Sequence, residues 1–158
     1  MATGFFGKLP VSGDFVARGL PAGVQPVVDR WLTRVLAPCM NNPGLWPPDG
    51  LRALIAHADA PLALLVLPSR DAAGRAFPLA AVARAPAVGQ GGIDLWAGQV
   101  LTVLQAAGLG GMDADRLAAA LGQVPDPSGG KPLVPPLLWA PAMPAQDPAA
   151  FVRAMTGI

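Results

Sequence analysis

Polar residues of the kinds that bind or react gather in two short stretches of this 158-residue chain. The central stretch holds Ser69, Asp71 and Arg75, and the N-terminal stretch holds Gly13 and Asp14. An arginine beside carboxylates can bind an anionic group or recognise a charged partner, because the guanidinium donates hydrogen bonds in a fixed fork. The candidate partner-binding residues are Gly13, Asp14, Arg18, Ser69, Asp71 and Arg75.

The alternative is that these residues only stabilise the fold. Asp14 and Asp71 can accept hydrogen bonds from backbone amides in turns, and Arg75 can pair with an aspartate. Gly13 and Gly74 can adopt backbone angles that other residues resist. In the functional alternative, the two stretches adjoin in the fold and form a recognition surface. The sequence leaves both alternatives open.

The other reactive residues are few. The chain has one histidine, His57, one cysteine, Cys39, and ten acidic residues that are all aspartate. Zinc sites usually take several histidine or cysteine ligands, and the aspartates lack the spacing of a calcium loop. No serine lies in a G-x-S-x-G elbow, and Pro132 after Gly130-Lys131 breaks the phosphate-binding loop pattern. We therefore expect no metal, no cofactor and no enzymatic activity, with His57 and Cys39 in structural roles.

The composition is unusually apolar, with 53% hydrophobic and 13% charged residues. The longest apolar run, Ala60 to Leu67, is much shorter than the ~20 residues of a membrane span, and the N-terminus lacks a signal-peptide pattern. We therefore expect a cytoplasmic protein that does not span a membrane. The net charge of +1 and the scattered basic residues argue against nucleic acid as a partner. The apolar excess either fills a core with alanine or forms a patch for a partner, including a second copy in a homodimer.

The elements that position the polar residues can be predicted from apolar spacing. Two apolar runs in Pro61 to Arg84, separated by a segment with Asp and Gly, predict a central hairpin with a polar tip. A short strand is predicted over Gly4 to Leu9, followed by a turn and a connection to a helix over Gln25 to Ala37. The apolar residues of that helix recur with helical spacing: Val27, Val28, Trp31, Leu32, Val35 and Leu36.

The remaining elements follow from capping residues and proline. Residues 41–50 are predicted to form a loop from which Trp46 folds back onto the core. We expect a strand at Leu51–Ala58, a helix capped by Asp94 that runs to Ala107, a shorter helix from Asp113 to Leu121, an extended proline-rich segment from Pro125 to Pro148 and a last helix from Ala149 to Met155. Nothing divides the chain into two domains, so residues 1–158 are expected to form one.

The two polar stretches also carry a family resemblance. GFFGKLPVSGDFVARGLP near the N-terminus and LPSRDAAGRAFPL in the middle resemble the TagF family, also called ImpM, which is associated with bacterial type VI secretion. The matching positions are Gly4, Gly7, Lys8, Leu9, Pro10, Gly13, Asp14, Phe15, Val16, Arg18, Gly19, Leu20 and Pro21, then Pro68, Ser69, Asp71, Gly74, Arg75, Phe77, Pro78 and Leu79. The chain departs from the pattern at Ser12, where arginine is frequent, and at Ala76, where an aromatic residue is usual.

The resemblance implies a cytoplasmic accessory protein that is not an enzyme. It implies a post-translational repressor of type VI secretion that acts through the forkhead-associated (FHA) scaffold protein. The implied fold is α/β, a mainly antiparallel sheet flanked by helices and similar to longin domains. Two other functions remain open. One is a sensor of small anions, or a cryptic hydrolase, that uses a pocket at Ser69, Asp71 and Arg75, and the other is a structural component of the baseplate or sheath.

Overall fold

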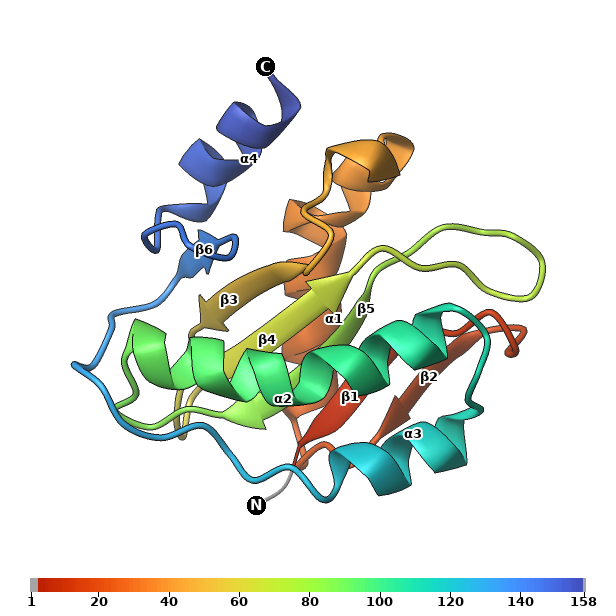
Figure 1. The fold of residues 1–158 in the computed structure, drawn as a ribbon, viewed down its shortest axis with the longest axis horizontal. Coiled ribbons are helices and arrows are strands. Elements are labelled where there is room, and N and C mark those ends of the chain that lie inside the picture. Colours follow the sequence, from red (N-terminus) through yellow and green to blue (C-terminus); the bar gives the residue numbers. More distant parts are fainter. Residues whose placement is uncertain (1–2, 158) are drawn as a thin grey trace.

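Six strands form one antiparallel sheet in the computed structural model, which describes residues 3–157 (Figure 1). The strand order across the sheet is β2-β1-β5-β4-β3-β6, and each neighbouring pair is antiparallel. The strands are β1 (Gly4–Lys8), β2 (Phe15–Arg18), β3 (Leu51–Ile55), β4 (Leu62–Leu67), β5 (Leu79–Arg84) and β6 (Leu137–Trp139). The pairing of β4 with β5 confirms the predicted central hairpin.

Helices cover both faces of this sheet. Helices α2 (Gln90–Gly108) and α3 (Ala114–Leu121) pack on one face, in front of the strands in Figure 1. Helices α1 (Val24–Val35) and α4 (Pro148–Thr156) pack on the other face, and two short 3-10 turns, η1 (Ala37–Asn41) and η2 (Pro43–Leu45), lead from α1 toward β3. This arrangement confirms the predicted fold class, a mainly antiparallel sheet flanked by helices.

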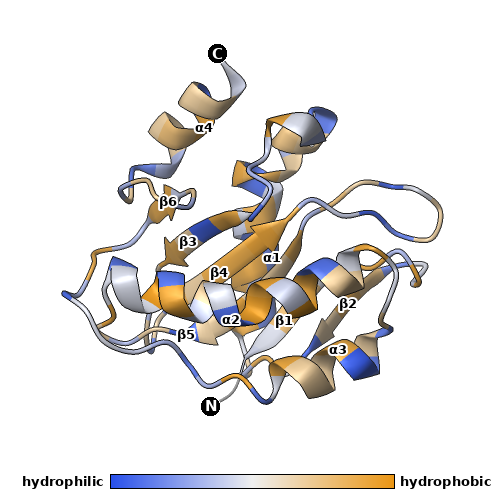
Figure 2. Cartoon of the chain, in the orientation of Figure 1, coloured by the Kyte–Doolittle hydropathy of each residue, from blue (hydrophilic) through white to orange (hydrophobic). Residues whose placement is uncertain are grey.

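The central strand β4 explains much of the apolar excess. Leu62, Leu64 and Val66 pack with α1, whereas Ala63, Leu65 and Leu67 point to the opposite face and pack with α2. Alternate side chains of a strand point to opposite faces, so a strand covered on both faces is apolar at every position. Figure 2 shows β4 as a continuous hydrophobic ribbon in the middle of the molecule. The apolar run that predicted the hairpin therefore fills two cores.

The edge strand β2 is absent from the sequence-based prediction, which placed only a connection at this point. Its four residues pair with β1 from Lys8 opposite Phe15 to Phe5 opposite Arg18. Both ends of the strand are exposed and its middle is half-buried, so its sequence carries no clear alternation of buried and exposed positions. A strand this short is defined by its backbone pairing, which composition does not reveal.

The predicted start of the long helix is wrong, because α2 begins at Gln90 and not after Asp94. Asp94 lies one turn inside the helix, where Oδ1 accepts a hydrogen bond of 2.8 Å from the buried indole of Trp139. Gly89 and Gly92, before it in the chain, allow close packing against residues 128–131. A β-carbon at Gly92 would lie 2.4 Å from the carbonyl oxygen of Ser128. The glycines therefore mark an approach between segments, whereas the prediction treated them as the loop before a helix.

Several local predictions are confirmed and others need small corrections. Asp113 and Asp147 cap α3 and α4 through the backbone amides of Arg116 and Ala150. Trp46 is buried and donates to the carbonyl of Cys39, which is itself buried. The strand predicted to reach Ala58 ends at Ile55, and His57 lies beyond it. The proline-rich segment contains the short strand β6, which pairs with β3.

Candidate functional site

Asp71 is the centre of the polar cluster that joins the two sequence motifs. It lies in the connection between β4 and β5 and is only 2% exposed. Its Oδ1 accepts hydrogen bonds from the backbone amides of Ala73 (3.0 Å) and Arg75 (2.9 Å). Its Oδ2 accepts from Lys8 Nζ (3.0 Å) and Arg75 Nε (2.8 Å). These four bonds use both oxygens of the carboxylate.

The environment keeps Asp71 ionised. Burial disfavours the charged carboxylate, but the backbone amide of Arg75 and the side chains of Lys8 and Arg75 together outweigh it and lower the pKa of Asp71 to about 2. A general acid or base works best when its pKa is near the operating pH. Asp71 is therefore suited to holding the cluster together and unsuited to proton transfer near neutral pH.

The local sequence DAAGR explains how the connection folds around this carboxylate. An aspartate at the start of a turn can accept from backbone amides a few residues further on, as Asp71 does. The amide of Gly74 in turn donates to the carbonyl of Asp71, and the amide of Asp71 donates to the carbonyl of Arg75. Gly74 has a φ of 82°, in the left-handed region that glycine adopts without strain. The structural prediction for Asp71, Gly74 and Arg75 is thus confirmed.

Three further hydrogen bonds fasten this connection to the N-terminal motif. Ser69 Oγ donates to the carbonyl of Lys8 (2.7 Å), and the amide of Ala72 donates to the carbonyl of Ser12 (2.8 Å). Arg75 Nη2 donates to the carbonyl of Gly13 at 2.9 Å. The two motifs therefore adjoin, as predicted, and the contacts between them are mainly to backbone carbonyls.

The other candidate residues lie at the edge of this cluster or away from it. Gly13 has no left-handed backbone and a β-carbon there would meet nothing within 4 Å, so its predicted special conformation is wrong. Asp14 is exposed and accepts from the amide of Phe15. Arg18 stands at the far end of β2, about 10 Å along the strand from Phe15. Its guanidinium is 3.5 Å from the exposed carboxylate of Asp115 in α3.

Lys8 is a central residue of the cluster that sequence reasoning missed. Its side chain is 8% exposed, and its ammonium lies between Asp71 Oδ2 and the ring of Phe15, 4.9 Å from the ring centroid. Phe15 stacks on Phe6 and meets Phe77 edge-on, with ring centroids 5.7 and 4.8 Å apart. The signal is present in the sequence: a lysine at the end of a buried strand needs a counter-charge, and the motifs supply an aspartate and aromatic rings.

A cavity of about 260 Å³ lies beside the hairpin connection, but Asp71 and Arg75 do not line it. Its polar lining comes from Ser69 and Arg70, next to Met40, Pro43 and Gly74. Arg70 is exposed and has no carboxylate at ion-pair distance within residues 3–157. The pocket predicted at Ser69, Asp71 and Arg75 is therefore formed instead around Ser69 and Arg70.

Among residues 3–157, no three His, Cys, Asp or Glu side chains are grouped so that they could hold a metal ion. The helices described here are all too short or too polar to cross a membrane. Burial raises the pKa of the Cys39 thiol, which disfavours the reactive thiolate.

These features define a mixed α/β domain in which a buried lysine–aspartate pair joins an N-terminal motif to a central hairpin. The sequence profile described as "TagF N-terminal domain, Type VI secretion system-associated" matches residues 4–124. The chain therefore belongs to this family of type VI secretion-associated proteins, as the resemblance of its two motifs implied.

A solved structure extends the comparison beyond residue 124. The crystal structure of PA0076 from Pseudomonas aeruginosa PAO1 matches with a TM-score of 0.65 and 26% sequence identity, over 99% of this chain and 77% of that one. The similarity thus includes β6 and α4, which lie outside the family match. A search of curated proteins finds no match.

Proposed function

We propose that this protein is a non-enzymatic accessory protein of the type VI secretion system. In this proposal it acts in the cytoplasm as a post-translational repressor, by binding the system's FHA scaffold protein. Family membership supports the link to type VI secretion. Repression, the FHA scaffold as partner and the cytoplasm as compartment are proposed in addition to this link.

The observation that carries the binding role is that the motif's most reactive side chains are occupied by internal contacts. Ser69 Oγ donates a hydrogen bond to the carbonyl of Lys8. Asp71 accepts four hydrogen bonds, and its pKa is about 2. A nucleophilic serine needs a nearby base to accept its proton, and an acid–base residue needs a pKa near the working pH. This occupancy favours binding over catalysis.

The same cluster presents groups to solvent that a partner could contact. The Arg75 side chain is 64% exposed, although Nε and Nη2 are held by Asp71 and Gly13. Phe15 is 45% exposed beside the exposed carboxylate of Asp14. Arginine and aromatic side chains fixed by neighbours lose little entropy on binding and are frequent at the centres of interfaces. Gly13, Asp14 and Arg75 are therefore the exposed predicted residues at this cluster, whereas Arg18 is exposed at the far end of β2.

Calorimetry of the purified protein with the FHA scaffold from the same bacterium tests the partner, and secretion assays test the repression. We expect a dissociation constant of roughly micromolar or tighter, and higher effector secretion from a strain that lacks this protein. An Asp14→Arg variant should bind more weakly, and Asp59→Arg, at an exposed aspartate in the connection between β3 and β4 that lines none of the cavities described here, is the matched control. Secretion that is unchanged in the deletion strain would contradict repression.

A sensor of small anions is the second candidate, favoured by the 260 Å³ cavity at Ser69 and Arg70. An exposed arginine beside a hydroxyl can bind phosphate or a carboxylate. A thermal-shift measurement with inorganic phosphate and with citrate tests this. A ligand at about 100 times its dissociation constant should stabilise the protein by roughly 2.7 kcal/mol. The gain should vanish in Arg70→Ala, and equal Tm values with and without anions would exclude binding of these anions.

A further inference from the structure

Helix α1 carries two parallel apolar stripes, and only one is fully covered by the sheet. Val24, Val28 and Leu32 are buried. Val27 and Trp31 directly precede two of these residues in the sequence, and together with Val35 they are only half-buried. Residues that recur every three to four positions share a helix face, so the second stripe forms a continuous apolar strip beside the first. That strip is available for contacts beyond those of the described fold.

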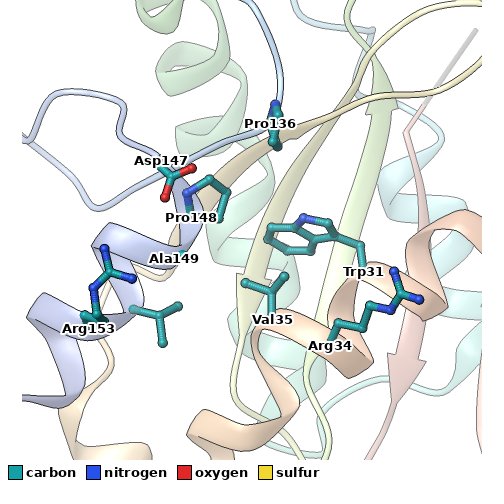
Figure 3. A pocket seen from close by; sticks show the side chains of 9 residues that line it. Trp31, Arg34, Val35, Pro136, Asp147, Pro148, Ala149 and Arg153 are labelled. Atoms are coloured by element: carbon teal, nitrogen blue, oxygen red, sulfur yellow. The ribbon is translucent and has the colours of Figure 1, made fainter. Parts of the chain in front are cut away.

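The half-buried stripe lines a groove between α1 and α4. A cavity of about 570 Å³ separates the two helices, and a cavity of about 350 Å³ continues along α1 to Ile55 and Ala56 at the end of β3. The two cavities share Trp31, Arg34, Val35 and Pro136, so they form one groove. Figure 3 shows Trp31 and Val35 of α1 across this space from Pro148 and Ala149 of α4.

Three arginines, Arg30, Arg34 and Arg153, stand on the rim of the groove. All three are exposed, and none has a carboxylate at ion-pair distance within the described part of the chain. The one acidic residue that lines the groove, Asp147, caps α4 through the amide of Ala150. On α1, Asp29 accepts a hydrogen bond from Thr33 and is not part of the lining. The rim is therefore locally positive on a chain of net charge +1.

We infer that this groove binds an acidic amphipathic segment of a partner protein. Apolar side chains of the segment pack on Trp31, Val35 and Val152, and its Asp or Glu residues pair with the rim arginines. Helices bind apolar grooves in this way, and tryptophan and arginine are the residue types that contribute most at such sites. The inference deepens the proposed function and rests on it only for the partner that is tested first, the FHA scaffold.

A second copy of this chain fits the groove less well than an acidic segment does. In a two-fold dimer the same patch occurs on both sides of the interface. A contact of groove with groove would place arginines from both rims close together, and like charges across an interface are unfavourable. The charge of the rim thus selects a partner of opposite sign.

The tryptophan indoles provide a direct readout of binding. The chain has four tryptophans, and three of them donate their indole N–H inside the fold: Trp46 to Cys39, Trp96 to Thr3 and Trp139 to Asp94. Trp31 lines the groove. In ¹⁵N-labelled protein, a ligand in the groove should shift the Trp31 indole signal, assigned with Trp31→Phe, and leave the other three nearly unchanged.

Charge reversal on the rim provides the affinity test. The Arg34→Glu/Arg153→Glu variant should bind the scaffold about tenfold more weakly, because each reversal replaces an exposed ion pair by repulsion. Arg116→Glu/Lys131→Glu makes the same change of net charge at two exposed residues that do not line the groove. This control should bind within about twofold of the unmodified protein.

Two designed peptides make the test independent of the scaffold. Both are helices of about four turns with the same leucine stripe, one with glutamate and one with lysine at all other positions. The glutamate peptide should shift the Trp31 indole signal and bind more weakly at high salt, whereas the lysine peptide should have no effect.

The outcomes separate the groove from the proposed partner. If the scaffold binds but the Trp31 signal and the affinity of the rim variant do not change, the groove inference is overturned and the proposed function stands. If the scaffold does not bind, the proposed partner fails, and the peptides decide on the groove. A shift with the glutamate peptide alone supports the inference. A shift with both peptides or with neither overturns it, as does concentration-dependent dimerisation that the rim variant abolishes.

Discussion

The polar cluster that joins the two motifs, here called the junction, and the groove between α1 and α4 use arginine in opposite ways. The junction consists of Lys8, Ser69, Asp71 and Arg75. Arg75 is held by Asp71 and by the carbonyl of Gly13, where the two sequence motifs meet. Arg34 and Arg153 are exposed on the rim of an apolar groove and have no ion pair among residues 3–157. A charge used for internal structure is paired, and a charge available to a partner is not. The comparison therefore assigns stability to the buried centre of the junction and recognition to the groove, in addition to the exposed groups at the edge of the junction that we propose as partner contacts.

The largest expected effect is from Asp71→Asn. The amide nitrogen would replace one carboxylate oxygen, so either the side-chain donors of Lys8 and Arg75 or the backbone donors of Ala73 and Arg75 would face another donor. Lys8 would also keep a buried charge without its counter-ion. We expect thermal unfolding roughly 10 °C lower. Asp14→Asn is the control. Asp14 is exposed and accepts one hydrogen bond, which an asparagine oxygen can also accept, so the Tm should remain nearly unchanged.

A double-mutant cycle between Lys8 and Asp71 would sharpen the assignment. Lys8→Met keeps an unbranched side chain against Phe15 and leaves Asp71 with three of its four hydrogen bonds, so it should be milder than Asp71→Asn. The double variant removes both charges and should be more stable than the sum of the single losses predicts. Strictly additive losses, measured by urea denaturation, would mean that the pair does not act as a unit.

Acid should destabilise the junction by protonating Asp71. The folded pKa of Asp71, about 2, lies below the ordinary value of 3.8, so this group adds stability above about pH 4 and loses it progressively as the pH falls toward 2. Urea denaturation at several pH values between 6 and 2 measures this loss. Asp71→Asn, already less stable, should show a smaller further loss across that interval, and parallel curves for the two proteins would contradict the role of Asp71.

The sequence predicted the junction better than it predicted the groove, and the helix α1 explains why. Its apolar spacing predicts one stripe of six residues; five of them lie on α1, and Leu36 is the C-cap, because the helix ends at Val35 and not at Ala37. Which of these residues become buried depends on the position of α4, which begins more than a hundred residues later. Composition and periodicity describe each helix separately, so they do not reveal a space between two of them.

Two errors in the fold predicted from the sequence have related physical causes. The edge strand β2 is defined by backbone pairing with β1, which leaves little pattern in four residues. Asp94 had the right type and position to cap a helix, but it serves the indole of Trp139, 45 residues away. Within the hairpin connection, by contrast, Asp71, Gly74 and Arg75 also contact one another within five residues, and such local contacts are those that local sequence predicts.

The smallest expected effect is from Arg34→Glu on stability, and it is the sharpest contrast with Asp71. The arginine is exposed and has no ion pair within the described residues, so the folded protein should lose almost nothing when its charge is reversed. We expect a Tm within about 2 °C of the unmodified protein, with weaker binding of the acidic segment. A large fall in Tm would show that the rim arginine supports the fold after all, and the division between the two regions would fail at that residue.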